Sequence, residues 1–562
     1  MPRLTARSLA LLPLAFLALL LVAPVLRLLA EGFGGGDLGG GAVPGEPLRW
    51  LALWQDDYLR WRVVWSFLQA AITCVLALLL GLPLAWVLAR RDFAGRALVL
   101  RLLMLPFVVP TLVAALGVLA LWGPRGWLGA PLAEAGFLLE ETPWLLLYGN
   151  LFFNLCLVVR AGVDALEQVS APRVAAARTL GATPWRAFWR VEWPAIAPWL
   201  ASALCLVFLY CFSGFGLALI LGGQRYATVE VEIYTLVAYE LALGPAGVLA
   251  VWMLGLTGSV ALGYAWLEKR LAAPGRVTPI ARTRPRGAAQ WLAVWAAVVV
   301  LLLVCAAPLI AILAQAARAF WIGQGAAVLG EPETLAALWN TLRFTAMALT
   351  LATGLGLSHA LAVRAFDSAA AARGAVRGGR AASAAQGAWA LGWRAAAYLP
   401  FVVSPVTVAF GLLLLYPGWT ASLALLIGAY ALLAYPFVAK SLMAALDNLP
   451  ASYAQAAATL GARPWRVLWR VTLPLVGRAL RRGMAFAAAT ALGEFAVTLF
   501  LSRPEWTTLT TLIYQRLGRP GEANLDAALV LACVLMALAL MAFALIEGPS
   551  DGLEPAAKNR SG

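Results

Sequence analysis

Residues 165–194 read ALEQVSAPRVAAARTLGATPWRAFWRVEWP, and residues 445–474 read ALDNLPASYAQAAATLGARPWRVLWRVTLP. The two stretches start 280 positions apart and match without a gap at 16 of 30 positions. The similarity extends beyond them, because the run LPFVV at residues 105–109 returns at residues 399–403. An internal repeat of this kind indicates two copies of one structural unit. The chain is therefore predicted to be a tandem duplication.

The chain around the repeats is far more apolar than a soluble protein. Hydrophobic residues make up 62% of its 562 residues and charged residues only 12%, whereas soluble domains are about 45–50% apolar and about 25% charged. Apolar runs of the roughly 20 residues that cross a bilayer recur from end to end. These features predict an all-α polytopic membrane protein without a large water-soluble domain.

Twelve candidate membrane spans form two sets of six, one set around each copy of the repeat. They are Leu9–Ala30, Val63–Ala89, Leu102–Trp122, Trp144–Gly162, Ile196–Leu221, Ala246–Leu267, Trp291–Leu313, Leu338–Val363, Ala395–Tyr416, Ser422–Met443, Leu480–Leu501 and Ala527–Ile546. The first run could also be a signal peptide, but its length favours a retained span. The predicted units are 1–267, with a loop at 164–195, and 291–562, with a loop at 444–475, joined by a cytoplasmic linker at 268–290.

The charged residues are divided unequally between the two sides of this topology. The net charge is +15, and most Lys and Arg lie on the side that holds both termini and both repeated loops, whereas Asp and Glu favour the other side. This positive-inside pattern predicts a multi-pass protein of the bacterial inner membrane with cytoplasmic termini. It disfavours nucleic acid as the partner of the basic run Lys269–Arg286. The Ala/Gly/Arg-rich segment Arg364–Arg394 is predicted to be a cytoplasmic loop without regular structure.

Each repeated loop is predicted to contain two short helices with a tight turn between them. Gly181 and Gly461 suit the left-handed conformation that ends a first helix, and Pro184 and Pro464 suit the first position of a second helix. The prolines that follow at 194 and 474 are predicted to end that second helix. An amphipathic membrane anchor is one interpretation, but two copies with the same Gly and Pro spacing favour a docking surface for two identical partner subunits.

The repeated loop resembles the cytoplasmic coupling loop of binding-protein-dependent ABC transporter permeases, whose core pattern is Glu-Ala-Ala, three residues, then Gly. The sequences AAARTLG at 175–181 and QAAATLG at 455–461 follow this pattern but lack its Glu. The resemblance implies two type I importer permease units, a pair of cytoplasmic ABC ATPase subunits docked on the loops, and a periplasmic substrate-binding protein. It assigns docking to Ala176, Ala177, Leu180, Gly181, Pro184, Ala456, Ala457, Leu460, Gly461 and Pro464.

The sequence gives no indication of chemistry within this chain. It contains no Gly-x-x-x-x-Gly-Lys-Ser/Thr phosphate-binding loop, so we expect ATP and Mg²⁺ to be bound by the partner ATPase and no cofactor in this chain. Its six cysteines lie in apolar stretches without paired ligand spacing, and no catalytic or metal site is predicted. The chain is therefore predicted to be a transport-path subunit and not an enzyme.

Short matches along nearly the whole chain are similar to the fused two-domain permeases of thiamine and thiamine diphosphate importers. They are Trp54–Leu59, Ser66–Ala70, Gly126–Leu128, Phe152–Asn154, Val191–Pro194, Glu232–Tyr234 and Ile513–Gln515. This resemblance implies a cargo with a positively charged ring. Fused permeases for ferric iron, or for another small solute, remain an alternative. An ion-coupled twelve-helix transporter is a weaker one, because it would have more charge within its spans and no repeated loop.

Glu494 is the ionisable residue inside a predicted span that we single out. A carboxylate in the middle of a span is costly and usually faces a cavity or a partner. Its counterpart in the first half is Gly214, so any site built on it is asymmetric. It is either a residue of the substrate path that contacts a cation or acts in gating, or a structural residue near a span end that bonds a neighbouring helix.

Overall fold

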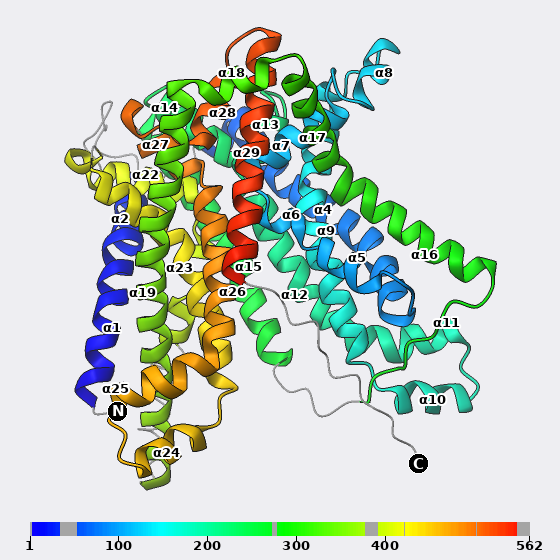
Figure 1. Ribbon diagram of the computed structural model, residues 1–562, viewed down its shortest axis with the longest axis vertical. Helices are drawn as coiled ribbons and strands as arrows, with labels where there is room; N and C mark the ends of the chain where they lie inside the picture. The colour runs from blue at the N-terminus through cyan, green and yellow to red at the C-terminus, as the bar shows by residue number, and fades with distance from the viewer. Residues whose placement is uncertain are drawn as a thin grey trace.

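The computed structural model describes residues 3–33, 53–271, 278–376, 392–420, 422–501 and 503–547 (Figure 1). Within these ranges all regular structure is helical apart from two isolated β-bridges. The prediction of an all-α protein is therefore confirmed. Part of the predicted linker, residues 272–277, and part of the predicted loop Arg364–Arg394, residues 377–391, lie outside the described residues.

The first half follows the predicted order of spans and loops. Its helices, with π-helical turns marked η, are α1 Arg3–Leu17, η1 Ala18–Val22, α2 Ala23–Gly32, α4 Asp57–Arg90, α5 Arg96–Leu102, α6 Leu105–Val108, α7 Thr111–Trp122, α8 Gly129–Glu134, α9 Trp144–Glu167, α10 Ala171–Thr179, α11 Pro184–Ala187, η4 Phe188–Glu192, α12 Trp193–Phe212, α13 Gly216–Leu221, α14 Val229–Ala238 and α15 Leu243–Leu271.

The second half repeats this order. Its helices are α16 Ala288–Leu301, η5 Leu302–Ala306, α17 Ala307–Trp321, α18 Gln324–Gly330, α19 Pro332–Val376, α21 Leu399–Val402, α22 Pro405–Leu415, α23 Leu423–Asp447, α24 Ala451–Thr459, α25 Pro464–Val467, η7 Leu468–Thr472, α26 Leu473–Leu492, α27 Ala496–Leu501, α28 Leu509–Leu517 and α29 Glu522–Glu547. Helix α19 continues well into the segment predicted to lack regular structure, and that part of the prediction was wrong.

Nine continuous helical segments in the described part of the chain are long and apolar enough to cross a membrane. A tenth crossing is added if Arg96–Val108 and Thr111–Trp122, which are bent by 108°, are counted together. These ten match ten of the twelve predicted spans. The other two predicted spans differ, because α22 has only 11 residues and α26 carries three arginines, Arg478, Arg481 and Arg482.

Four of the predicted spans are broken rather than straight. Two of them break where a proline follows Val109 or Ser404, and both of these residues are extended, with ψ of 132° and 153°. The proline causes this break, because its ring disfavours a helical conformation in the residue before it. The other two end early, at Phe212 and Leu492, and a short helix follows after three residues.

The first span of each half packs against the opposite half. Gly117 of α7 lies so close to α17 that an added Cβ would be 2.9 Å from the carbonyl oxygen of Pro308. Gly411 of α22 lies equally close to α2, because a Cβ added to it would be 2.9 Å from the carbonyl oxygen of Pro24. Small residues permit such close helix approach in membranes. The two halves are therefore interlocked by an exchange of their first spans.

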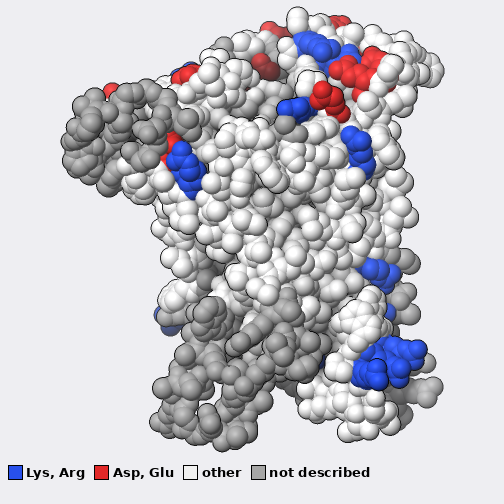
Figure 2. All heavy atoms as spheres, turned by 90° about the vertical axis from the view of Figure 1, so that its left-hand side faces the viewer, with Lys and Arg blue, Asp and Glu red and all other residues white. Residues whose placement is uncertain are grey.

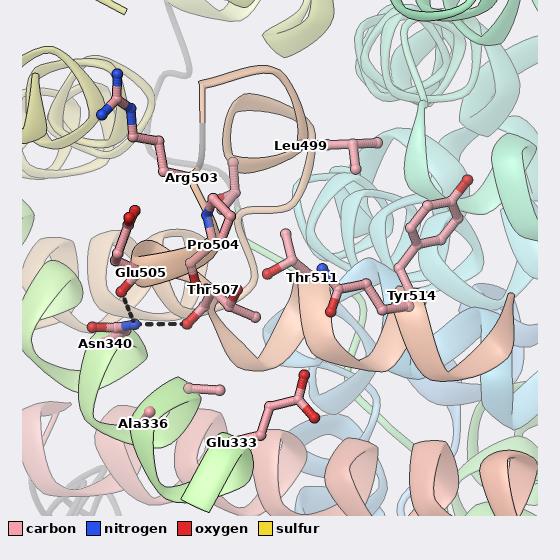
Figure 3. A pocket seen from close by; sticks show the side chains of 13 residues that line it. Glu333, Ala336, Asn340, Leu499, Arg503, Pro504, Glu505, Thr507, Thr511 and Tyr514 are labelled. Atoms are coloured by element: carbon pink, nitrogen blue, oxygen red, sulfur yellow. Dashed lines mark hydrogen bonds between the residues drawn. The ribbon is translucent and has the colours of Figure 1, made fainter. Parts of the chain in front are cut away.

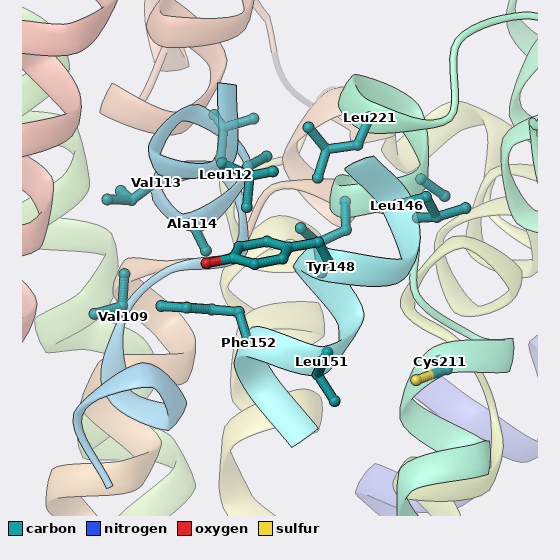
Figure 4. Close-up of a cluster of buried hydrophobic side chains, with 14 of the residues drawn as sticks. Val109, Leu112, Val113, Ala114, Leu146, Tyr148, Leu151, Phe152, Cys211 and Leu221 are labelled. Carbon is teal, nitrogen blue, oxygen red and sulfur yellow. The ribbon is translucent and has the colours of Figure 1, made fainter. Parts of the chain in front are cut away.

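A tyrosine hydroxyl fixes each exchanged span at its π-helical turn. Tyr148, in the middle of the buried cluster of Figure 4, donates to the carbonyl oxygen of Leu303 in η5 at 2.6 Å. Tyr416 donates to the carbonyl oxygen of Leu19 in η1 at 3.0 Å. A π-helical turn frees carbonyl groups from the ordinary helical pattern. In each half, a tyrosine hydroxyl therefore bonds a carbonyl in the π-helical turn of the first span of the other half.

We expect Gly117→Ala and Gly411→Ala to lower the midpoint of thermal unfolding of the purified protein. The new Cβ would force apart two packed helices, and overpacking of this kind costs about 1–3 kcal/mol. Gly255→Ala and Gly354→Ala are matched controls, because no atom lies within 4 Å of the added Cβ at either helical position. They should stabilise slightly, since Ala is the better helix former. Equal midpoints for all four variants would contradict the close approach.

The charged side chains on the visible face lie mostly near the two ends of the molecule. In Figure 2 the middle of the visible face is almost free of coloured charged side chains. Acidic side chains gather at the upper end together with several basic ones, and the coloured charges near the lower end are basic. The lower end is where α10 and α24, the first helices of the two repeated loops, both lie in Figure 1. Both loops therefore emerge on the same basic side of the molecule.

Candidate functional site

The first repeated loop contains the predicted pair of short helices. Helix α10 ends in a turn in which Gly181 has φ of +86°. The Gly181 N–H donates to the carbonyl of Arg178 at 3.1 Å, and the Ala182 N–H donates to the carbonyl of Ala177 at 3.0 Å. These two bonds define the Schellman motif. The next helix, α11, begins at Pro184, and its N-cap Thr183 accepts a bond from the Arg186 N–H at 3.3 Å.

The second repeated loop has the same turn. Gly461 has φ of +77°, and its N–H donates to the carbonyl of Ala458 at 3.0 Å. The Ala462 N–H donates to the carbonyl of Ala457, also at 3.0 Å. Helix α25 begins at Pro464, as predicted. Both loops therefore have one backbone conformation, and in both a glycine holds the turn.

The two loops present matching apolar residues to solvent. Leu180 and Leu460 are 88% and 87% exposed, and Trp185 and Trp465 are 70% and 68% exposed. Each of these indoles packs against the next tryptophan of its helix, at ring distances of 5.5 Å and 5.4 Å. Exposed apolar side chains that gather in one patch mark an interaction surface, whereas single exposed leucines do not. The other predicted docking residues are exposed at Ala176, Ala456, Pro184 and Pro464 and half-buried at Ala177 and Ala457.

Each loop continues directly into a span, contrary to the prediction that the prolines at 194 and 474 end the second helix. Helix α11 runs through the π-helical turn η4 into α12, and Pro184–Phe212 is one continuous segment of 29 residues. The same succession joins α25, η7 and α26. Each proline lies in the first turn after a π-helical turn, where a missing N–H is tolerated. A rigid helical rod therefore connects each loop with the centre of the protein.

Ion pairs hold the base of each loop, buried between Arg90 and Glu192 in the first half and partly exposed in the second. In the first half Arg90 bonds Glu192 of η4 at 2.6 Å, and Arg96 bonds Glu167, the last residue of α9, at 3.0 Å. In the second half Arg394 bonds both Asp367, at 2.8 Å, and Asp447, the last residue of α23. Position 447 corresponds to 167 at the repeat spacing of 280. An arginine therefore anchors the acidic residue before the docking helix in both halves.

A cavity of about 310 Å³ lies between the two halves, where the four broken spans meet. Phe215 and Phe495, which are equivalent by the repeat, stack on one another across it at a ring distance of 5.9 Å. The contact of equivalent residues places the cavity on the axis that relates the halves. Its lining is mostly apolar, and seven of its 27 residues are aromatic, namely Phe107, Phe153, Tyr210, Phe215, Phe401, Phe437 and Phe495. The two helical rods from the loops end at this cavity.

Glu494 lines this cavity, but it does not lie inside a continuous span as predicted. It occupies the break between α26 and α27, where its Oε1 accepts a hydrogen bond from the N–H of Val497 at 3.0 Å. The side chain thus caps the N-terminus of α27, a position that favours a carboxylate. Its equivalent, Gly214, lines the same cavity. Both interpretations of Glu494 thus retain support, because the carboxylate has a structural bond and also borders the cavity.

Glu230 is a second buried carboxylate beside the cavity, and the sequence analysis missed it. It lies on α14, outside the predicted spans, and is completely buried. Ser404, a cavity-lining residue of the other half, donates to its Oε2 at 2.8 Å. Its Oε1 has no hydrogen-bond partner among the described residues. The sequence analysis did not single it out, because it lies in the connection between two predicted spans.

A larger hollow of about 580 Å³ lies at the end of the second half opposite the loops (Figure 3). There Asn340 donates to the carbonyls of Glu505 and Thr507 at 3.0 Å and 2.9 Å. In the first half the longer Arg62 reaches the equivalent carbonyls of Arg225 and Ala227. The ring contact of Phe495 with Tyr514, 5.3 Å between centres, links its lining to that of the central cavity.

Comparisons with known proteins agree with this architecture. Residues 77–273 and 383–546 match the family described as binding-protein-dependent transport system inner membrane component. The thiamine transport system permease protein of Escherichia coli (strain K12) is 30% identical over 517 residues, which cover 89% of this chain and 90% of that protein. The thiamine permease of Haemophilus influenzae is 27% identical and covers 92% of this chain and 94% of that protein.

A relative of another kind matches a shorter stretch. The sulfate transport system permease protein of a Synechocystis strain is 34% identical over 192 residues, which are 33% of this chain and 69% of that protein. The family match falls once in each half and covers more than half of the chain, as the repeated loop and the duplicated helices require. This chain therefore belongs to the family of inner-membrane components of binding-protein-dependent transport systems.

Proposed function

We propose that this chain is the transport-path subunit of an ATP-driven importer for thiamine and thiamine diphosphate. Thiamine permeases of two bacteria align with both of its halves over about nine-tenths of its length, which supports the assignment. The observation that carries it is the central cavity, with seven aromatic side chains and one carboxylate in its lining. Both cargoes contain a flat, positively charged thiazolium ring. Aromatic faces and a carboxylate are the groups that attract such a cation.

Two copies of a cytoplasmic ABC ATPase are the proposed partners at the repeated loops. The identical turns and the matching exposed leucines at 180 and 460 support two equivalent docking sites for one kind of subunit. ATP and Mg²⁺ are bound in that partner and not in this chain. A periplasmic binding protein delivers the cargo at the opposite end. Both termini are then cytoplasmic, as the basic character of the loop side requires.

The helical rods suggest how ATP binding opens the path. A displacement of α11 or α25 by the ATPase is carried along α12 or α26 to the breaks at 213–215 and 493–495. These breaks border the central cavity on both sides of the axis. Packed helices transmit such displacements because they are nearly incompressible. The breaks absorb the motion, so the two stacked phenylalanines at 215 and 495 separate and admit the cargo.

Transport in reconstituted vesicles tests this function. The complex of chain and ATPase is placed in vesicles, with ATP on the side of the loops and the binding protein on the other side. We expect labelled thiamine to accumulate on the ATP side, and to do so only in this arrangement. Accumulation of ferric iron instead would support the iron permease alternative. Uptake without the ATPase, driven by an ion gradient, would support a secondary transporter. Uptake driven by ATP supplied on the side opposite the loops would reject the proposed orientation.

A further inference from the structure

The linker between the halves is more than a connection, because residues 278–286 lie against the cytoplasmic end of the first half. In Figure 1 the trace that precedes α16 passes close to α10 and α11. Its contacts occur at both ends of an extended segment, through bridges of Pro279 with Ser170 and of Thr283 with Arg91. We call residues 278–286 the strap.

Backbone hydrogen bonds hold the strap at two places. The N–H of Ala171, the first residue of α10, donates to the carbonyl of Thr278 at 3.0 Å. At the other end Thr283 donates its N–H to the carbonyl of Arg90 and accepts from the N–H of Asp92, both at 3.0 Å. The strap thus joins the start of the first docking helix with the end of α4.

Side chains add to these bonds. Arg282 donates to Glu167 at 2.7 Å, on the same carboxylate oxygen that Arg96 contacts. The Arg91 guanidinium donates to the Thr283 hydroxyl at 2.9 Å, and Ile280 packs against the apolar core of the first half. Glu167 is the last residue of α9, and three residues separate it from the start of α10 at Ala171. The strap therefore reaches the docking helix both directly and through α9.

The second repeated loop has a different anchor. Asp447, at the position equivalent to Glu167, is held by Arg394 of its own half. Among the residues that the structure describes, no distant segment makes a backbone hydrogen bond to Ala451, where α24 begins. The two loops have the same turn and the same exposed face but are fixed differently. Only the first of them is tied to the covalent connection between the halves.

We propose that the strap positions α10, so that displacement of this helix is passed to α4 and α9 rather than lost in movement of the loop alone. Arg282 and Thr283 act as positioning residues, because they touch the anchors of the loop and not the cargo. The inference rests on the proposed function in one respect, that α10 docks the ATPase. It predicts that weakening the strap reduces the coupling of ATP hydrolysis to import by degrees. This loss of coupling should arise at the first repeated loop only.

The test measures ATP hydrolysed per thiamine imported in reconstituted vesicles. Thr283→Pro removes the N–H that bonds Arg90, and Arg282→Glu reverses the charge beside Glu167. Loss of one ordinary backbone hydrogen bond changes an equilibrium by roughly fivefold, so we expect Thr283→Pro to raise this ratio about fivefold, with a smaller rise for Arg282→Glu. The matched controls are Ala281→Pro, whose N–H makes no hydrogen bond among the described residues, and Arg284→Glu. An equal ratio in all four variants and the native protein would overturn the proposal.

A crosslinking measurement separates failure of the strap from failure of the proposed function. Ser170→Cys with Pro279→Cys places two thiols at paired positions of the isolated bridge, a separation that a disulfide can span. The disulfide should form readily in native membranes and should restore coupling to Thr283→Pro. Absence of the crosslink would reject the strap whatever the cargo is. A crosslink that forms in a complex without thiamine-dependent ATP hydrolysis would reject the proposed function and leave the geometry of the strap supported.

Discussion

A variant with both Gly181→Val and Gly461→Val is expected to lose thiamine uptake almost completely while its spans still insert and pack. Both glycines have positive φ, at +86° and +77°. A left-handed conformation costs an ordinary residue about 1–2 kcal/mol, and a β-branched residue more. The turn between the docking helices would therefore rearrange and displace the exposed leucines that come directly before these glycines. The measurements are uptake in vesicles and the amount of ATPase that co-purifies with the permease.

The same positions provide their own control. No atom lies within 4 Å of a Cβ added to Gly181 or Gly461, so the strain comes from the backbone alone. Asn tolerates the left-handed conformation better than other residues with a side chain. The double Asn variant is therefore expected to retain most of the uptake. Normal transport and normal ATPase binding in the double Val variant would show that these loops are not the coupling surface.

The repeated loops could be predicted from the sequence because their structure is local. A glycine at the end of one helix and a proline at the start of the next specify a turn without help from the rest of the fold. The turns at Gly181 and Gly461 confirm this in both halves. The continuation past Pro194 was missed, because a π-helical turn places this proline in a first helical turn. Such turns have no recognisable sequence pattern.

The central cavity depends on contacts that no local pattern reveals. Hydropathy identified the apolar runs, but a break within a run changes neither its length nor its composition. The prolines at 110 and 405 were visible signals for two of the four breaks, since the residue before a proline is pushed towards an extended conformation. The exchange of first spans depends on glycines such as Gly117, whose role appears only when the opposite half is in place. Glu230 was missed for the same reason, because its partner Ser404 belongs to the other half.

Replacement of Glu494 by Gln is expected to slow thiamine uptake about tenfold while the ATPase remains bound. Opposite charges a few ångströms apart attract far more strongly at an effective dielectric of about 20 than in water, so loss of this carboxylate weakens the attraction for a thiazolium ring in the cavity. Gln keeps an oxygen that can accept the bond from the Val497 N–H, so α27 remains capped. The measurement is the initial rate of uptake at several thiamine concentrations.

Val497→Pro is the matched control, because it removes the N–H that bonds Glu494 and leaves the carboxylate in the cavity wall. Val497 is the second residue of α27, where a proline is tolerated. If Glu494 attracts the cargo, Glu494→Gln slows uptake strongly and Val497→Pro only slightly. If its role is to cap α27, the order is reversed, and unimpaired uptake in Glu494→Gln excludes a contact with the cation.

We also expect Glu230→Gln to slow thiamine uptake less than Glu494→Gln does, because Glu230 reaches the cavity only through Ser404. The two carboxylates can then be ranked by their distance from the path, one at its wall and one behind it.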